Sequence, residues 1–181
     1  MTRSNRSARA AGTLILAIDP GHTESGWVLI DGETCQPLEF GKTPNAEVLD
    51  LFRRGDLLLA DPLPIVIIEM VASYGMSVGA DVFETCVWVG RFQQHALTGL
   101  GTLPALVKRL PVKLHHCHDS RAKDSNIIQA LVDRFAPGQP NHGKGTKANP
   151  GWFYGFAKDI WQAYALAVYV ADTNLQGDPT P

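Results

Sequence analysis

Three acidic residues stand where elements of the fold are expected to end or begin, and together they could bind metal ions. Asp19 and Glu69 each close a short apolar run, and Asp159 lies in the first turn of an Ala-rich stretch. Buried carboxylates without partners are costly, and a divalent cation would neutralise them. Oxygen ligands without a nearby Cys or His favour Mg²⁺ or Mn²⁺ over zinc. Such a cluster suits phosphoryl transfer assisted by two metal ions about 4 Å apart.

Each acid alone also has an ordinary structural explanation. Asp19 precedes Pro20 and Gly21, where an Asp is typical of a turn. Asp159 at a helix start complements the helix macrodipole. The placement of all three acids within one topology is what favours a metal site.

Five strands are expected to position the first two acids. The apolar patterns place them at residues 13–19, 27–30, 38–40, 65–70 and 111–115. Asp31 and Gly32 form a turn signal, so the first three strands should make an antiparallel meander. If the first and fourth strands are neighbours, Asp19 and Glu69 converge at one edge of the sheet.

Helices are expected between and after the later strands. Spacing and composition place them at residues 45–56, 81–97, 120–135 and 158–171, the last one buried and preceded by a Gly- and Pro-rich loop at 137–155. The fold class is therefore α/β, with a five-stranded mixed sheet flanked by helices. We expect residues 13–172 to form the domain, 1–12 to be a flexible basic arm and 173–181 to be a disordered tail.

Composition limits the class of protein. A chain of 181 residues with 45% hydrophobic residues suits one globular domain, and no apolar run reaches the length of a membrane span. Cys35, Cys86 and Cys117 are odd in number and widely spaced, which favours free thiols and a soluble, cytoplasmic protein. The formal net charge of −2 means that any nucleic-acid contact must depend on local basic patches.

Candidate nucleic-acid contacts are few. Arg121 and Lys123 lie at the start of an expected helix, where they could bind backbone phosphate, although Asp119 and Asp124 could instead pair with them. The other candidates are Lys144, Lys147 and Tyr74. The two lysines lie in a Gly-rich loop that could order on DNA or simply be flexible, and the tyrosine could stack on an unpaired base or pack locally.

The cluster HHCH, at residues 115–118, raises the question of a zinc site. If these residues continue a strand, alternate side chains point to opposite faces of the sheet. That geometry disfavours metal binding by the cluster.

Two strings carry a resemblance to a known family. ILAIDPGHTESGWVLID resembles the first strand, turn and second strand of RuvC-type Holliday junction resolvases, and IVIIEMVASYG resembles their second motif, which ends in Glu. SRAKDSNIIQALVDRF and KGTKANPGWFYGFAKDIWQAYALAVYVA are similar to small phage-type members of the RNase H-like superfamily. The match runs over most of residues 13–172.

The resemblance implies an RNase H-like fold and a Mg²⁺-dependent endonuclease of branched DNA acting in recombination and repair. Asp19, Glu69 and Asp159 would bind the metal, Mn²⁺ could replace Mg²⁺, and Lys123 would assist at the phosphate. A homodimer is expected because two symmetric cuts resolve a four-way junction, and the helix at 81–97 is a candidate surface. One departure concerns the last helix, where RuvC proteins place a second acid and this chain has Gln162.

Three alternatives stay open. The chain could be an RNase H-like nuclease of RNA–DNA hybrids or flaps, or a catalytically weak nucleic-acid-binding protein that has lost the fourth carboxylate. An actin-like ATPase would share the acid and Gly turn of the first strand, but no further Gly-rich phosphate loop is present. Asp124 and Asp172 are weak substitutes for the missing acid, and Asp172 is more than three helical turns from Asp159.

Overall fold

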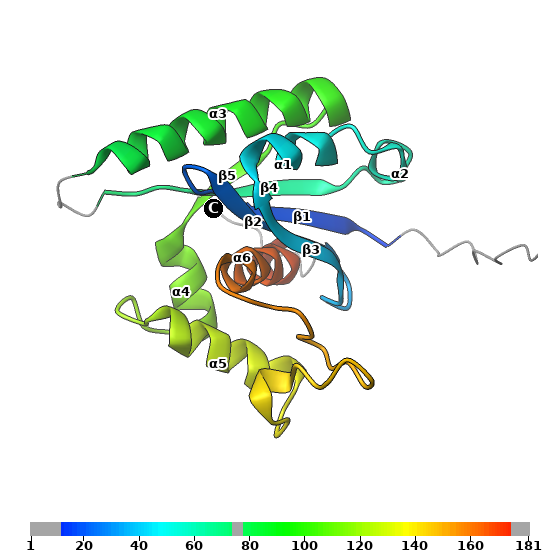
Figure 1. Ribbon diagram of the computed structural model, residues 1–181, viewed down its shortest axis with the longest axis vertical. Coiled ribbons are helices and arrows are strands. Elements are labelled where there is room, and N and C mark those ends of the chain that lie inside the picture. The colour runs from blue at the N-terminus through cyan, green and yellow to red at the C-terminus, as the bar shows by residue number, and fades with distance from the viewer. Residues whose placement is uncertain (1–11, 74–77, 175–181) are drawn as a thin grey trace, which may run out of the picture.

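A mixed sheet forms the centre of the molecule, with helices on both faces (Figure 1). The computed structural model describes residues 12–73 and 78–174. The strands occur in the order β3-β2-β1-β4-β5 across the sheet. Their bounds are β1 Leu14–Asp19, β2 Glu24–Asp31, β3 Pro37–Pro44, β4 Ile65–Met70 and β5 Ala105–Lys108.

Pairing within the sheet agrees with the expected arrangement. β1, β2 and β3 form an antiparallel meander, whereas β4 pairs in parallel with β1 and β5 pairs in parallel with β4. The turn after β2 is held by Asp31, whose carboxylate accepts hydrogen bonds from the backbone N–H groups of Glu33 and Thr34. The predicted five-stranded α/β sheet is confirmed.

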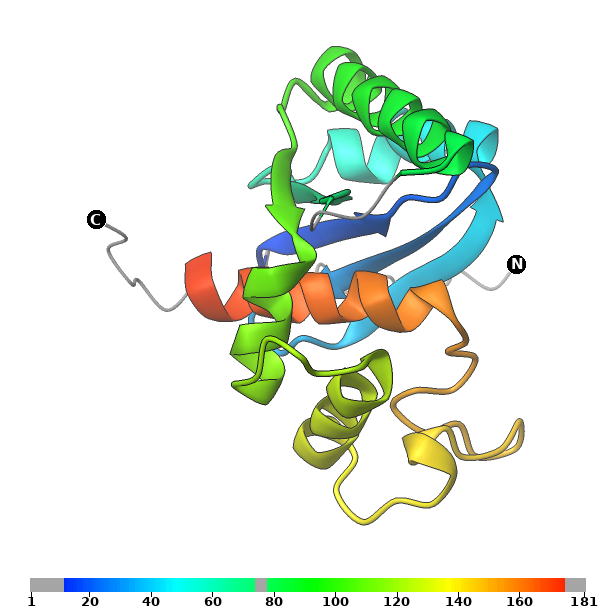
Figure 2. The same cartoon turned by 90° about the vertical axis from the view of Figure 1, so that its left-hand side faces the viewer.

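The helices form two layers. α3 lies with α1 and α2 over one face of the sheet, and α6 lies across the other face, between the sheet and the α4–α5 pair (Figures 1 and 2). The bounds are α1 Asn45–Leu51, α2 Gly55–Leu58, α3 Ala80–Leu100, α4 Arg109–Cys117, α5 Asp124–Phe135 and α6 Asp159–Asn174, with a 3₁₀ turn at Asn141–Gly143.

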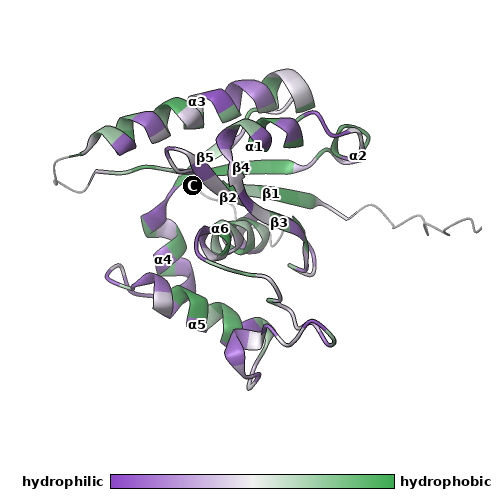
Figure 3. Ribbon diagram, viewed as in Figure 1, coloured by the Kyte–Doolittle hydropathy of each residue, from purple (hydrophilic) through white to green (hydrophobic). Residues whose placement is uncertain are grey.

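Alternation along β1 supplies both hydrophobic cores. Ile15 and Ala17 pack in the core beneath α6, whereas Leu16 and Ile18 pack in the core beneath α1 and α3. Side chains alternate between the faces of a strand, so a strand covered on both faces is apolar throughout. Figure 3 shows β1 and β4 as mainly hydrophobic, which is why these two strands give the clearest sequence signal.

α6 is buried on nearly every side. Its small residues Ala163, Ala165 and Ala167 are fully buried, and so are Tyr164 and Leu166. A helix that is apolar all round belongs inside a protein, and alanines allow close approach to the sheet. The expected buried final helix is confirmed, and its first turn lies against the meander.

The prediction for the fifth strand is wrong. Residues 111–115 belong to α4, and β5 is instead the short segment ending at Lys108. Pro111 stands in the first turn of α4, where the missing N–H costs no helical hydrogen bond. β5 is only four residues long and largely exposed, so its apolar pattern is weak.

Two helix boundaries also differ from expectation. The helix expected at 45–56 is two pieces, since α1 ends at Leu51 and α2 starts at Gly55. The helix expected from residue 120 begins at Asp124, because Asp119 first forms a turn by accepting the backbone N–H of Arg121. In the parts of the chain that the structure describes, no helix has the length and apolarity to cross a bilayer. The three cysteines are free.

Candidate metal centre

Asp19 and Glu69 lie side by side at the carboxyl ends of two parallel strands. The register pairs Ile18 of β1 with Ile68 of β4, and the two acids come one residue later. Each follows its strand's alternation, which directs both side chains to the face covered by α6. The sheet therefore gathers the first two predicted acids at one edge.

Asp159 reaches the same edge because Gly26 has no side chain. Gly26 is the β2 partner of Asp19, and a Cβ on it would lie 2.6 Å from the backbone carbonyl of Asp159. No real Cβ contact is so short, so only glycine permits this approach. Phe153 and Phe156 pack against Trp161 and anchor the start of α6. The structure thus brings all three predicted acids into one neighbourhood.

A buried polar network holds the turn that follows Asp19. The Ser25 hydroxyl donates to the Asn45 side chain at 2.6 Å and accepts from the Gly21 backbone N–H at 3.3 Å. The Asn45 amide donates in turn to the Gly21 carbonyl at 2.9 Å. Both side chains are fully buried, and hydrogen bonding offsets the cost of burying them. The backbone on both sides of the turn is fixed as a result.

Arg109 is a central residue of the site that sequence reasoning missed. One guanidinium nitrogen donates to Glu69 at 3.1 Å, and another donates to Asp124 at 2.7 Å and to the side-chain oxygen of Gln162. The side chains of Arg109 and Glu69 are both only 16% exposed. The available signal was the basic pair Lys108 and Arg109 after the apolar ALV of β5, and the misplaced fifth strand obscured it.

A second cation from the chain, Lys42, was also missed. Its ammonium lies 2.7 Å from Asp159 and 3.9 Å from Glu24. Lys42 pairs with Gly26 across β2 and β3, so the meander itself places it at the start of α6. Glu69 and Asp159 are therefore each matched by a positive side chain.

Asp19 differs from the other two acids. Among residues 12–73 and 78–174, its carboxylate has no hydrogen bond or ion pair. Burial raises the pKa of Asp19 well above its ordinary value, and the charges of Glu69 and Asp159 raise it further. Burial also raises the pKa of Glu69, even though Arg109 opposes the shift. The edge thus carries negative charge that the fold leaves partly uncompensated.

The donor chemistry around Asp19 suits a hard divalent cation. The available ligands are carboxylate and amide oxygens, and Asp19, Glu69 and Arg109 line a hollow of 240 Å³. Within the described residues, however, no three acidic, His or Cys side chains are grouped so that they could hold a metal ion as they stand. Glu69 faces Arg109 and Asp159 faces Lys42. The ligand roles of the three acids stay a prediction.

The predicted DNA contacts lie at different distances from this edge. Lys123 is exposed and directly precedes Asp124, which binds Arg109, so it lies beside the site. Arg121 is exposed on the same turn. Lys144 and Lys147 lie in the loop that packs on the end of α5 through the stacked rings of Phe135 and Trp152. Tyr74 lies outside the described residues.

The histidine cluster links α4 to α6 through hydrogen bonds. His115 and His116 lie in the last turn of α4, not in a strand, so the alternation expected for them does not apply. His115 bonds to Asp172 at 2.7 Å, and His116 donates to the backbone carbonyl of Ala165 at 2.8 Å. Burial lowers the pKa of His116 to about 4, so this ring is neutral at pH 7. Asp172 is remote from Asp159, as expected.

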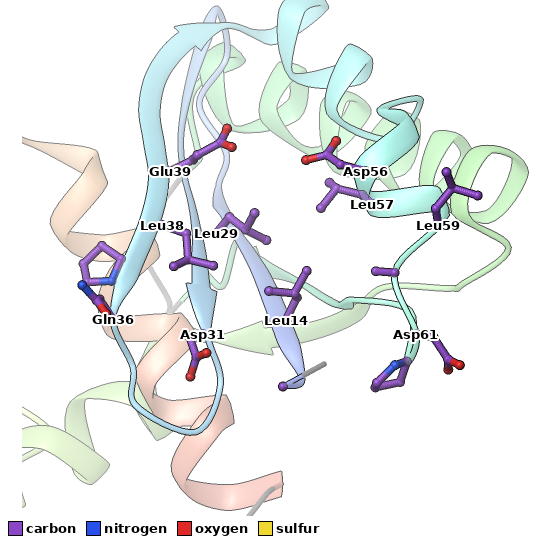
Figure 4. Close-up of a pocket in the computed structure, with 14 residues that line it drawn as sticks. Leu14, Leu29, Asp31, Gln36, Leu38, Glu39, Asp56, Leu57, Leu59 and Asp61 are labelled. Atoms are coloured by element: carbon purple, nitrogen blue, oxygen red, sulfur yellow. The ribbon is translucent and has the colours of Figure 1, made fainter. Parts of the chain in front are cut away.

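A larger cavity than the hollow beside Asp19 lies at the opposite end of β1. It has a volume of 810 Å³ and is lined by Leu14, Asp31, Glu39 and Asp56, among others (Figure 4). Arg54 holds Glu39 at 2.5 and 2.9 Å and Asp56 at 2.6 Å, so two of its carboxylates are already matched within the chain. This cavity therefore does not compete, as the reactive centre, with the carboxylate edge, the end of β1 and β4 where Asp19 and Glu69 lie beside Asp159.

Comparison with known proteins gives a structural relationship only. Neither a scan against protein-family models nor a search of curated proteins finds a match. A structure of RuvC from Thermus thermophilus superposes with a TM-score of 0.61 at 15% identity, covering 91% of this chain and 96% of RuvC. The T. thermophilus RuvC in complex with a Holliday junction substrate gives a TM-score of 0.60 at 14% identity, covering 88% and 93%.

The fold is that of RuvC. The five-stranded mixed sheet flanked by helices is the RNase H-like arrangement that the sequence predicted. Within this RuvC-like fold, Asp19 and Glu69 end adjacent central strands and Asp159 begins the last helix. At such low identity the likeness describes the fold, and function must be argued from the site.

Proposed function

We propose that this chain is a divalent-metal-dependent endonuclease that cuts branched DNA such as Holliday junctions. The observation that carries the proposal is the placement of the partly buried Asp19, which has no hydrogen bond or ion pair in the part of the chain that the structure describes, beside Glu69 and Asp159 on a RuvC-like fold. Mg²⁺, or Mn²⁺ in its place, suits these oxygen donors. The neighbouring RuvC structure with a Holliday junction substrate supports branched DNA as the substrate class.

Different residues of the chain would bind the metal and the DNA. Asp19 and Asp159, with Glu69, would hold the cation, which would activate water and stabilise the leaving oxygen when bound. Lys123, exposed at the start of α5, would bind the scissile phosphate, and Arg121 would contact the DNA backbone nearby. Lys144, Lys147 and Tyr74 remain proposed contacts for DNA further from the cut.

Cleavage of a labelled four-way junction tests the proposal, beside matched duplex, flap and RNA–DNA hybrid, each with Mg²⁺, Mn²⁺ or EDTA. Wild type should cut the junction with either metal and not in EDTA, and Asp19→Asn should lose cleavage while still binding the junction. Asp133→Asn, which changes an exposed acid on α5, is the matched control and should cut normally. Preferential cutting of flap or hybrid would keep the nuclease and replace its substrate. Binding without metal-dependent cleavage would favour the catalytically weak binding protein.

A homodimer is part of the proposal, with α3 as the contact surface. Phe83, Val87 and Leu97 are 63%, 57% and 44% exposed, and the first two lie one turn apart. Exposed apolar side chains on one helix often mark a protein contact. Sedimentation should give a dimer that Val87→Lys converts to a monomer. Leu59→Lys, at an exposed apolar position near α2, should leave the dimer intact. A monomeric wild-type protein would exclude this surface.

A further inference from the structure

We propose that the guanidinium of Arg109 is a built-in cation that stands where a second metal ion would bind, so that the site takes one divalent ion. This inference rests on the proposed metal-dependent nuclease function. Arg109 contacts Glu69, Asp124 and Gln162 at once, through two of its terminal nitrogens. Three oxygen-bearing side chains thus converge on one permanent positive charge.

The position of Arg109 is fixed by the sheet. Glu69 pairs with Val107 and Met70 pairs with Lys108 across β4 and β5, so Arg109 comes directly after the last paired residue. It is the first residue of α4, and its side chain returns over the end of β4. The side chain is only 16% exposed. The short strand therefore delivers this cation to the carboxylate edge.

The charges around Arg109 are those of an occupied cation site. Glu69 and Asp124 supply two carboxylates, and Gln162 supplies a neutral oxygen one turn into α6. A divalent ion on the same oxygen of Glu69 would meet strong repulsion from the guanidinium. Within the described residues Asp19 has no ion pair, although Arg109 acts on it through its charge, and Asp159 pairs with the part-exposed Lys42. One metal ion at Asp19 completes the charge balance, and a second has no place.

The substitution has a chemical consequence. A guanidinium is always charged and only donates hydrogen bonds, so it can stabilise negative charge on a phosphate but cannot generate a nucleophile. Water activation would then fall to the single metal at Asp19. Arg109 would act at the substrate phosphate as a fixed electrostatic stabiliser.

Counting bound Mn²⁺ by electron paramagnetic resonance, in the absence of DNA, tests the proposal without any measurement of cleavage. Wild type should bind one ion per chain. Gln162→Glu alone should still bind one, because Arg109 remains in place. The double variant Arg109→Gln with Gln162→Glu should bind two. Arg53→Gln, at an exposed arginine that lies 3.9 Å from Asp50, is the control and should bind one.

Specific results would overturn the inference. Two ions in wild type or in Gln162→Glu would mean that Arg109 does not take a metal's place, and no bound ion in wild type would exclude the site altogether. One ion in the folded double variant would also overturn it. If circular dichroism shows the double variant unfolded, the count in Gln162→Glu decides. A wild type that binds one Mn²⁺ but cuts no branched DNA would contradict the proposed function and leave the inference about Arg109 standing.

Discussion

A partly buried acid lies at each end of α6, but only one of the two has hydrogen-bonding partners among the described residues. Near the last turn, Asp172 accepts hydrogen bonds from Arg134 at 2.6 and 2.8 Å and bonds to His115 at 2.7 Å. Burial alone would raise the pKa of Asp172, but these partners outweigh burial and lower it. Near the first turn, Asp19 has no such partner among the described residues, and its pKa is raised.

The contrast separates a structural acid from a functional one. Asp172 is only 11% exposed, yet the chain supplies its counter-charge from α4 and α5, so it joins three helices. Asp19 has no ion pair among the described residues, and the charge of Arg109 does not offset its burial, so the ionised carboxylate lowers the stability of the fold. Perturbed carboxylates of this kind are concentrated at functional sites. Four substitutions can break or sharpen the contrast.

The largest effect should come from Gly26→Ala, which disturbs the approach of α6 to Asp19. The new Cβ would lie 2.6 Å from the Asp159 backbone, so the start of α6 must shift. A misplacement of about 1 Å near reacting groups can cost roughly 100-fold in rate, and we expect a loss of that order in junction cleavage. Gly55→Ala, where a Cβ meets nothing within 4 Å, is the control. Normal cleavage by Gly26→Ala would show that Asp159 need not lie so close.

Asp172→Asn should destabilise the fold without affecting the site. The amide keeps the shape but loses the charge that Arg134 and His115 bind, and hydrogen bonds to charged groups are worth about 1.5–3 kcal/mol. The free energy of unfolding in urea should fall by about that amount, with Mn²⁺ binding unchanged. Asp133→Asn, on the exposed side of α5, should change stability little. An unchanged free energy of unfolding in Asp172→Asn would show that Asp172 does not stabilise the fold, which would contradict the comparison.

Asp19→Asn should have the opposite effect on stability when metal is absent. Because the folded pKa of Asp19 is raised, its charge opposes folding at neutral pH, and the neutral Asn should unfold at a higher temperature. The gain should shrink as pH falls through the folded pKa and vanish below the unfolded value. The loss in Asp172→Asn should also vanish in acid, since the lowered pKa of Asp172 stabilises the fold only above that range. Thermal melts across pH check both signs, and a less stable Asp19→Asn at pH 7 would contradict the comparison.

The same contrast explains what could be predicted from the sequence. Asp19 and Glu69 lie at the carboxyl ends of six-residue apolar strands that are covered on both faces, so the strand pattern could be recognised and the shared edge followed if the two strands are neighbours. Arg109 follows a four-residue, largely exposed strand whose pattern is too weak to recognise. The segment PVKLH after it alternates apolar and polar residues as a strand would, although it is helical. Lys42 belongs to an edge strand with mixed polarity, and only the register of the meander places it at Asp159. Ion-pair partners that only the tertiary structure brings together leave no pattern in the local sequence.

Lys42→Gln should have the smallest effect, and it tests whether the chain's own cation competes with metal. The Lys42–Asp159 pair is partly exposed, and such pairs contribute roughly 0.2–1 kcal/mol. Releasing Asp159 should therefore raise the affinity for Mn²⁺ by no more than about fivefold, measured by titration calorimetry. Lys147→Gln, in the distant loop, should leave the affinity unchanged. A weaker affinity in Lys42→Gln would mean that the lysine holds Asp159 in place for the metal. Lys42 would then position Asp159 in the first turn of α6, as Arg134 positions Asp172 in the last.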